Sequence, residues 1–219
     1  VPEEYGGGGA GIGDLAAVCE EVCAAGTPML LMVVSPAICA TVIARFGTEE
    51  QKKRWLPGFA EGSVRMSFAI TEPDAGSNAH RLTTTARRDG DDWVLSGRKV
   101  FISGVDEADA VLVVGRTTDA RTGKLKPALF VVPTDAPGLE YRAIPMDLVS
   151  ADKQFELTLD DVRLPADALV GSEDAAIAQL FAGLNPERIM GAAFSAGVAR
   201  YALDKAVAYA KERDVFGSP

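Results

Sequence analysis

The stretch Met66-Ser67-Phe68-Ala69-Ile70-Thr71-Glu72-Pro73-Asp74-Ala75-Gly76-Ser77 decides how this chain is organised, because an apolar β-rich run gives way there to a loop of small polar residues. A loop directly after a strand can present backbone N–H groups and the hydroxyls of Thr71 and Ser77 to a ligand. Such segments are also common as plain connections between elements. The residues alone leave both interpretations open.

Short β-rich runs continue on the C-terminal side of this stretch. They alternate with turn signals such as Asp89-Gly90-Asp91-Asp92, without helical patterns between them, and we expect strands at 64–70, 83–88, 93–102, 111–114, 129–132 and 155–159. Many short strands with tight turns favour an antiparallel barrel or sandwich over a parallel nucleotide-binding sheet.

Helical patterns flank the β-rich region on both sides. Upstream, 14–46 has the composition of a helix, with Asp14 as its cap, and Thr48-Glu49-Glu50-Gln51 is a capping box that begins another. Downstream, Asn185-Pro186 indicates a capping residue followed by proline at the first helical position, and a long core helix over 187–211. The sequence predicts an α+β protein with an N-terminal helical domain (1–62), a central antiparallel β-barrel or sandwich domain (63–171) and the start of a C-terminal helical bundle (172–219).

Composition and charge exclude several classes of protein. Hydrophobic residues make up 47% of the chain and charged residues 24%, which is ample for a buried core. The net charge of −9 disfavours nucleic acid and anionic membranes as partners. The longest apolar run, 28–43, is interrupted by Pro36 and is shorter than the roughly 20 residues of a membrane span. Nothing resembles a signal or transit segment, so we expect a cytoplasmic protein.

Cysteines and glycines give weaker signals. Cys19, Cys23 and Cys39 all lie in an apolar stretch, so we expect reduced core thiols; neither a histidine nor a further cysteine lies near enough in sequence to complete a metal site, and no metal is expected. The glycine run at 6–9 predicts a mobile loop, and it lacks the neighbouring strand and Lys-Ser/Thr of a phosphate-binding loop. His80, the only histidine, lies in a polar loop and is expected to face solvent.

A second stretch, Gly97-Arg98-Lys99-Val100-Phe101-Ile102-Ser103-Gly104, places an aromatic ring, a hydroxyl and a glycine where a strand leaves the sheet. A planar ligand could stack on Phe101 while Ser103 donates a hydrogen bond to it. The same alternation also fits an ordinary half-buried strand.

Five motifs, in order and spacing, resemble those of the acyl-CoA dehydrogenase family. They cover essentially the whole chain: the two stretches quoted above, Val1-Pro2-Glu3-Glu4-Tyr5-Gly6-Gly7, Asp160-Asp161-Val162-Arg163-Leu164-Pro165 and Glu212-Arg213-Asp214-Val215-Phe216-Gly217. The resemblance implies an N-terminal helical domain, a central β domain and a C-terminal bundle, with FAD between the β domain and the bundle. It also implies a homo-oligomer, a dimer or tetramer.

The resemblance also implies roles for individual residues. Phe101 takes the place commonly occupied by a tryptophan beside the flavin ring, and Ser103 that of a threonine near the flavin N5. Arg213 and Phe216 match residues that reach the FAD of a neighbouring subunit, although Arg213 also fits a solvated arginine at a helix end. Ser77 would lie near the pantetheine of the acyl-CoA as well as the flavin. The implied flavin-binding residues are Phe68, Ile70, Thr71, Gly76, Ser77, Phe101, Ile102, Ser103, Arg213 and Phe216.

The implied reaction is α,β-dehydrogenation of an acyl-CoA to the trans-2-enoyl-CoA, with electrons passed to an electron-transferring flavoprotein. In most of the family the catalytic glutamate lies beyond the end of this chain, but in the isovaleryl and long-chain subgroups the matching position is Glu187. Its other explanation is a first-turn glutamate favoured by the helix dipole, which would lower its pKa. Asn185 matches a position at the start of the CoA-binding helix, and Arg188 one that contacts substrate or orders the helix start.

The chain departs from the family pattern by its length. It lacks roughly the first third of the usual N-terminal domain and most of the C-terminal bundle, so we expect a chain truncated at both ends. Two alternatives remain open: a non-catalytic or flavin-poor subunit of a heteromeric assembly, and an acyl-CoA oxidase. The acyl-chain length and branching cannot be read from these residues.

Overall fold

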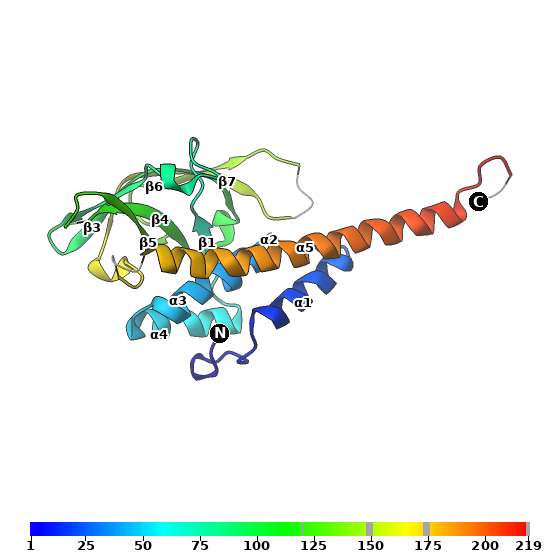
Figure 1. Cartoon of the computed structure of the whole chain (residues 1–219), viewed down its shortest axis with the longest axis horizontal. Helices are drawn as coiled ribbons and strands as arrows, with labels where there is room; N and C mark the ends of the chain where they lie inside the picture. The colour runs from blue at the N-terminus through cyan, green and yellow to red at the C-terminus, as the bar shows by residue number, and fades with distance from the viewer. Residues whose placement is uncertain (120, 148–150, 173–175, 218–219) are drawn as a thin grey trace.

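The structure, a computed structural model, describes every residue except 120, 148–150, 173–175 and 218–219. N-terminal helices and one long C-terminal helix lie together on one side of a curled β-sheet, and the order of helical and β regions along the chain confirms the prediction (Figure 1). Short 3₁₀ turns punctuate the chain at Glu3–Tyr5, Ala79–Arg81, Val105–Glu107 and Ala166–Ala168.

The N-terminal region contains several helices, and the expectation of one helix over 14–46 is wrong. Helix α1 (Ile12–Ala24) ends before Gly26, whose φ of +85° suits glycine, and Pro28 follows. The chain then forms α2 (Leu30–Met32), a π-helix (Val33–Ala40) and α3 (Thr41–Phe46). Pro36 lies inside the π-helix, and the wider turn accommodates its missing N–H.

The start of α1 differs from expectation, whereas that of α4 (Glu49–Glu61) is confirmed. Helix α1 begins at Ile12, so Asp14 is not the cap; its carboxylate instead accepts a hydrogen bond from Gly11 N (2.9 Å). At α4, Gln51 N donates to Thr48 Oγ1 (3.2 Å) and Thr48 N donates to Gln51 Oε1 (3.0 Å), which is the predicted capping box.

Among the described residues the sheet has seven strands: β1 (Met66–Ala69), β2 (Thr85–Asp89), β3 (Asp92–Ser103), β4 (Ala110–Thr118), β5 (Leu125–Pro133), β6 (Leu139–Ile144) and β7 (Gln154–Leu164). It is mixed rather than wholly antiparallel, because β4 pairs in parallel with β1 and, at one position, with β2. The loop at 70–84 takes the place of a tight turn after β1, so β1 can run in the same direction as β4. Strand β6 is an addition to the expected set.

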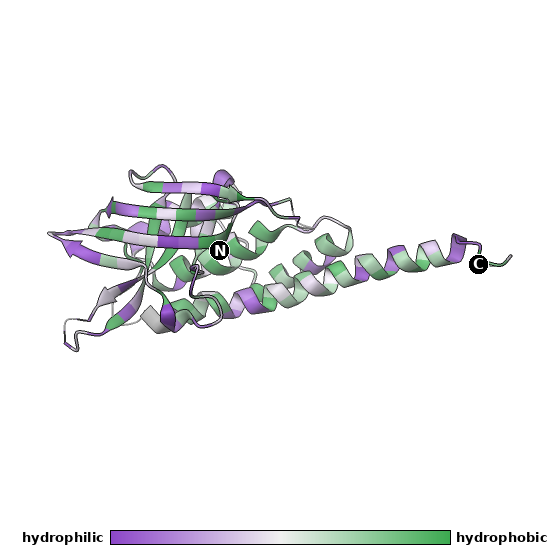
Figure 2. Cartoon of the chain, turned by 90° about the horizontal axis from the view of Figure 1, so that it is seen from above, coloured by the Kyte–Doolittle hydropathy of each residue, from purple (hydrophilic) through white to green (hydrophobic). Residues whose placement is uncertain are grey.

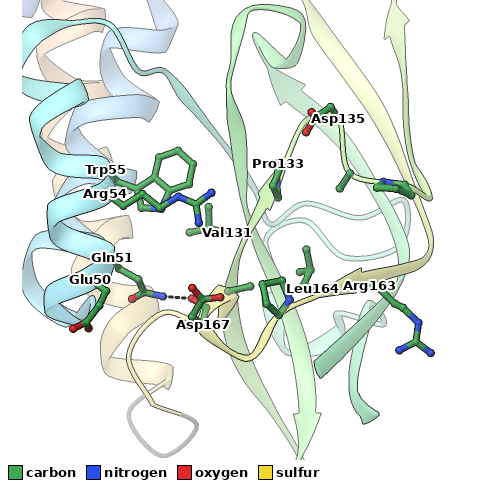
Figure 3. Close-up of a pocket in the computed structure, with 14 residues that line it drawn as sticks. Glu50, Gln51, Arg54, Trp55, Val131, Pro133, Asp135, Arg163, Leu164 and Asp167 are labelled. Atoms are coloured by element: carbon green, nitrogen blue, oxygen red, sulfur yellow. Dashed lines mark hydrogen bonds between the residues drawn. The ribbon is translucent and has the colours of Figure 1, made fainter. Parts of the chain in front are cut away.

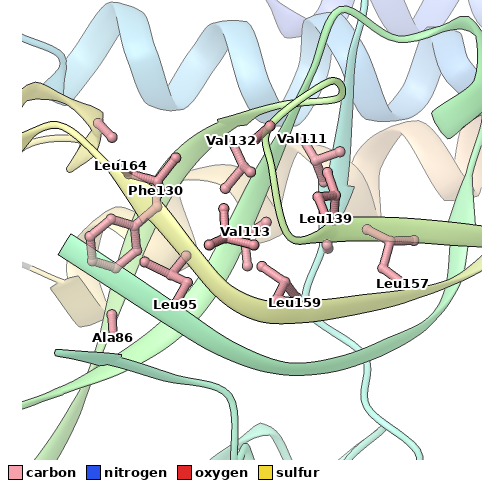
Figure 4. Close-up of a cluster of buried hydrophobic side chains, with 14 of the residues drawn as sticks. Ala86, Leu95, Val111, Val113, Phe130, Val132, Leu139, Leu157, Leu159 and Leu164 are labelled. Carbon is pink, nitrogen blue, oxygen red and sulfur yellow. The ribbon is translucent and has the colours of Figure 1, made fainter.

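The alternation of side chains along β4 and β5 explains why both faces of the sheet are buried. On one face Val111, Val113, Phe130 and Val132 join side chains of β3 and β7 in a core enclosed by the curl of the sheet (Figure 4). On the other face the intervening residues pack against the N-terminal helices and α5. Successive side chains of a strand point to opposite faces, and here neither face is left to water.

The C-terminal helix α5 (Ala176–Glu212) begins well before the expected start, and Pro186 lies inside it. Asn185 is therefore not its capping residue. The early start is stabilised by packing: Gly183 is buried so closely that an added Cβ would lie 2.9 Å from side-chain carbons of Ile38 and Val42. Burial of this kind offsets the hydrogen bond that a proline removes from a helix interior.

The two halves of α5 have different surroundings. Met190 is fully buried in a cluster with Cys19, Cys23, Val33 and Ala37. Residues 201–212 are all exposed, and this half projects past the rest of the molecule with apolar and polar residues mixed along it (Figures 1 and 2). The three cysteines are free and buried, as expected. Within the described residues no helix is long and apolar enough to cross a membrane.

Candidate functional site

The two stretches that the sequence singled out lie side by side. Val100 N donates to Thr71 O (3.0 Å), and Lys99 Nζ donates to Ile70 O (3.0 Å). The loop after β1 is therefore held against the last third of β3. The two stretches are brought together by the fold although about 30 residues of chain separate them.

A pocket of about 770 Å³ opens where these stretches meet. One wall comes from the loop after β1, a second from the bulged part of β3, and the rest from β6, the residues after it and β7. Its lining residues are Thr71, Glu72, Pro73, Gly76, Val100, Phe101, Arg142, Ala143, Ile144, Pro145 and Glu156. Glu156 accepts hydrogen bonds from Arg98 and from Arg142, so its charge is paired and its pKa is lowered by both.

Phe101 has the least ordinary conformation in this pocket. Its φ is +58°, in the left-handed region that bulky residues rarely adopt, and its side chain is 56% exposed. The pairing of β3 with β7 explains the position: the register shifts between Lys99 and Ile102, which is a β-bulge. A strained backbone that exposes a large aromatic ring is typical of a binding site.

Three other predicted flavin-binding residues are buried in the sheet and do not line this pocket. Phe68 and Ile102 are buried core residues, and Ser103 is buried with its hydroxyl accepting a hydrogen bond from Gln154 Nε2 (3.0 Å). Among the flavin-binding residues predicted from sequence, those that line the pocket itself are Thr71, Gly76 and Phe101.

A second pocket, of about 430 Å³, lies between the 76–82 segment, the end of β4, the start of β5, and α5. Ile70, Gly76 and Ser77 line it, and because Gly76 lines both pockets, the two adjoin. Its rim is basic. Its lining also includes His80, Arg116, Lys126, Leu180, Phe181, Leu184 and Arg188.

Arg116 braces this second pocket. Its guanidinium donates to the carbonyl oxygens of His80 (3.3 Å), Leu82 (3.2 Å) and Leu125 (2.9 Å), so it ties the 76–82 segment to the start of β5. His80 is exposed, as expected, and contributes to the pocket lining.

Glu187 lies in the interior of α5 and is partly buried. Burial raises its pKa, and the neighbouring charge of Arg188 opposes the rise only in part. The expected lowering by the helix dipole is wrong, because Glu187 lies eleven residues after the first residue of α5 and so outside its first turn. Glu187 is not among the residues that line the two pockets, whereas Arg188, the next residue, lines the second. Asn185 Oδ1 accepts a hydrogen bond from Arg188 (2.8 Å).

Arg213 and Phe216 are separated from this region. Both are exposed and follow the projecting end of α5, where Phe216 adopts a φ of +58° (Figure 1). Within one chain, the structure does not bring them to either pocket.

A third pocket, of about 350 Å³, lies between α4 and the edge of the sheet and contains no predicted site residue (Figure 3). Gln51 reaches across it at one end and donates to Asp167 O (2.6 Å) and Leu169 O (2.9 Å). These bonds fasten α4 to the segment after β7. No set of three or more His, Cys, Asp or Glu side chains is placed to hold a metal ion among the residues with described positions.

Sequence reasoning assigned no role to two residues beside the first pocket, Glu72 and Lys99. Their side chains form a buried ion pair with Nζ 2.9 Å from Oε1. The sequence offered no clear signal, because Glu72 lies in a polar loop and Lys99 in a β-rich run; the packing of the loop after β1 against β3 brings them together.

Three family models match the chain: the acyl-CoA dehydrogenase N-terminal domain at residues 1–63, the middle domain at 67–162 and the C-terminal domain at 177–219. Among curated proteins, acyl-CoA dehydrogenase FadE12 of Mycobacterium tuberculosis is 69% identical over 219 residues, which are 100% of this chain and 56% of the relative. The chain thus spans about half the length of the curated relatives it matches.

Two solved structures are similar along the same length. The glutaryl-coenzyme A dehydrogenase glutaryl-CoA complex has a TM-score of 0.92 at 33% identity and covers 100% of this chain and 56% of that one. A glutaryl-CoA dehydrogenase from Mycobacterium smegmatis in complex with FADH2 has a TM-score of 0.88 at 36% identity and covers 98% of this chain and 54% of that one.

Proposed function

The chain belongs to the acyl-CoA dehydrogenase family, and we propose that it binds FAD and takes part in oxidation of an acyl-CoA thioester to the trans-2-enoyl-CoA. In this proposal residues 63–171 form the FAD- and acyl-CoA-binding domain, between helical regions at 1–62 and 172–219. The observation that carries it is the exposed, left-handed Phe101 on the wall of the first pocket.

The donor set of the first pocket fits a flavin. The N–H groups of Thr71 and Gly76 and the hydroxyl of Thr71 make no hydrogen bond with any residue whose position is described, so they are available to a ligand. Phe101 offers an apolar face beside these polar groups. A flat ring with a polar edge suits such a wall.

We assign direct contact with FAD to Thr71, Gly76 and Phe101, supported by their place in the pocket lining, and include Ile70 and Ser77 from the adjoining pocket. Phe68, Ile102 and Ser103 are proposed to shape the wall from behind, since they are buried in the sheet. When bound, FAD supplies the acceptor for a hydride equivalent.

The second pocket is proposed to take the CoA arm of the substrate. Ser77, Asn185 and Arg188 are its proposed contacts, and the adjoining position of the two pockets supports an approach of the thioester to the flavin. The basic rim suits the phosphates of CoA. The solved complex with glutaryl-CoA supports a substrate of this class.

Glu187 is the proposed base that removes the α-proton of the thioester while a hydride leaves Cβ. Its raised pKa supports this role, because a carboxylate of higher pKa is a stronger base for carbon acids. Electron transfer to an electron-transferring flavoprotein completes the proposed cycle. We further propose a homo-oligomer in which Arg213 and Phe216 reach the FAD of a neighbouring copy. Their exposure just beyond the projecting end of α5 supports this proposal.

The experiment is an anaerobic absorbance titration of the FAD-loaded chain with a panel of acyl-CoA thioesters. The variants are Glu187→Gln and, as a matched control, Glu212→Gln, an exposed glutamate at the end of the same helix. We expect bleaching of the flavin band in the wild type and in Glu212→Gln, and its loss in Glu187→Gln.

Bleaching that survives in Glu187→Gln would move the base to another residue. A chain that takes up no FAD would contradict the proposal and favour a non-catalytic subunit. Rapid reoxidation of the reduced flavin by oxygen would favour an oxidase over transfer to a flavoprotein.

A further inference from the structure

A buried ion pair joins Glu72, which lines the first pocket, to Lys99 behind it. The side chain of Lys99 is 0% exposed and that of Glu72 is 2% exposed. Lys99 Nζ donates to three oxygens: Val114 O (2.7 Å), Glu72 Oε1 (2.9 Å) and Ile70 O (3.0 Å). The ammonium group therefore has a full set of acceptors.

The carboxylate of Glu72 is equally well satisfied. It accepts from Thr83 N (2.6 Å), Thr83 Oγ1 (2.7 Å) and Thr84 N (3.0 Å), as well as from Lys99. Burial alone would raise the pKa of Glu72. Hydrogen bonds from the Thr83–Thr84 segment and from Lys99, together with the positive charge of Lys99, lower that pKa to about 2. Burial lowers the pKa of Lys99 to about 8, although the hydrogen bond and the charge of Glu72 oppose this decrease. Both members of the pair are therefore ionised at neutral pH.

The bonds of this pair join the two walls of the pocket. Ile70 and Glu72 flank Thr71 in the loop after β1, and Lys99 precedes Val100 and Phe101 in β3. Thr71, Val100 and Phe101 line the pocket, so each lies within two residues of a bonded group. Val114 and Thr84 extend the network into β4 and to the start of β2.

A buried ion pair is weak evidence for a role in core stability. A buried ion pair pays a desolvation penalty, and apolar side chains of similar volume often stabilise a core as well or better. The strained backbone of Phe101, on the other hand, persists only where its surroundings fix it firmly. The hydrogen bonds of Lys99, two residues before Phe101, supply such fixation.

We propose that Lys99 and Glu72 are positioning residues, whose bond fixes the spacing between loop 70–77 and residues 99–103 that FAD binding requires. Neither residue needs to touch the reacting atoms. The inference rests on the proposed flavin site and goes beyond it, because it names what holds that site in its binding shape.

The test compares the full chain with Lys99→Met/Glu72→Gln, which removes both charges at similar volume. The matched control is Arg65→Met/Glu107→Gln, which removes an exposed pair with a 2.7 Å bond. Three properties are measured: the thermal unfolding midpoint, backbone hydrogen exchange without FAD, and the FAD dissociation constant together with the shape of the bound flavin spectrum.

We expect the Lys99→Met/Glu72→Gln variant to fold. Without FAD it should exchange faster than the control at 70–77 and 99–103. With FAD it should bind about tenfold more weakly or worse, and the fine structure of the flavin band should broaden. If this variant does not fold, Glu72→Gln alone keeps the shape and one acceptor, and the same results are expected of it.

Unchanged exchange at both segments in the folded variant would overturn the inference, as would an unchanged FAD dissociation constant. Failure of the wild-type chain to bind FAD is a different result, which would contradict the proposed function. The exchange measured without FAD still reports whether the pair fixes the two segments.

Discussion

Two regions carry residues expected to contact flavin, and they differ in how firmly contacts within the chain hold them. The pocket wall, residues 70–77 and 99–104, is fixed by backbone hydrogen bonds and by the buried Lys99–Glu72 pair. The α5 arm, residues 201–217, is exposed along its whole length, with Leu203 and Tyr209 each 63% exposed. The wall is held by contacts within one chain, whereas the side chains of the arm are left exposed by that chain. Of the two regions, only the pocket wall is therefore held in a fixed arrangement before a ligand binds.

Removing one lysine from each region should give the largest contrast. Lys99→Met leaves the Glu72 carboxylate buried without its cation, which should cost about 3–5 kcal/mol of the free energy of unfolding. Lys205→Met, on the exposed arm, should leave that free energy unchanged within error. Urea unfolding followed by circular dichroism measures both. Equal losses would remove the distinction between wall and arm.

Acid should weaken the wall through protonation of Glu72. The folded-state pKa of Glu72, about 2, is below its ordinary value of 4.5, so its contribution is fully present above pH 4.5 and is lost as the pH falls toward 2. We expect a loss on the order of 2 kcal/mol from this residue over that range. Chemical denaturation at a series of pH values measures it, with Glu72→Gln as the variant that should lack this part of the pH dependence. A curve that keeps its full slope in Glu72→Gln would assign the acid sensitivity to other carboxyl groups.

Phe101→Gly should separate the stability of the wall from its function. Glycine adopts a φ of +58° without strain, so the variant should be more stable by roughly 1 kcal/mol after the loss of an exposed side chain. FAD should bind more weakly, because the aromatic face is gone. Thermal melts and FAD titrations check the two halves of the prediction, and Tyr141→Gly, an exposed aromatic in β6, is the comparison. Destabilisation of Phe101→Gly would show that the ring has a structural role.

Changes in the arm should have the smallest effect on the chain itself. Arg213→Ala should leave the unfolding midpoint of a single chain unaltered, since its guanidinium makes no hydrogen bond within the described residues. A weaker FAD affinity in the oligomer alone would support its action on a neighbouring copy. A lowered midpoint in the monomer would contradict the exposed position of the arm.

The sequence predicted correctly those elements of the fold that are determined by residues close together in the chain. The Thr48 to Gln51 capping box is one case, since both its bonds lie within four residues. Strand β6 was not predicted, because Glu140, Tyr141 and Arg142 in it are all exposed and give no apolar alternation. The start of α5 was misplaced, because Asn185-Pro186 has the local form of a helix start, whereas the helix continues through it and packs at Gly183 against Ile38 and Val42.

For the candidate site, the sequence predicted which loops take part but not how they contact each other. The glycines, hydroxyls and aromatic residue of the two stretches indicated the loops that line the first pocket. Two features were not accessible from sequence: the bulge that turns Phe101 into the left-handed region, and the meeting of Lys99 with Glu72. The first arises from the pairing of β3 with β7, and the second from the packing of the loop after β1 against β3.

The most direct test of the pocket wall is hydrogen exchange of the full chain with and without FAD, resolved by peptide mass spectrometry. FAD is expected to slow exchange at 66–77 and 97–104, which supply two walls of the first pocket. Protection centred instead on 50–55, 131–137 and 163–168, which line the third pocket, would contradict it, as would FAD binding that leaves both wall segments unprotected.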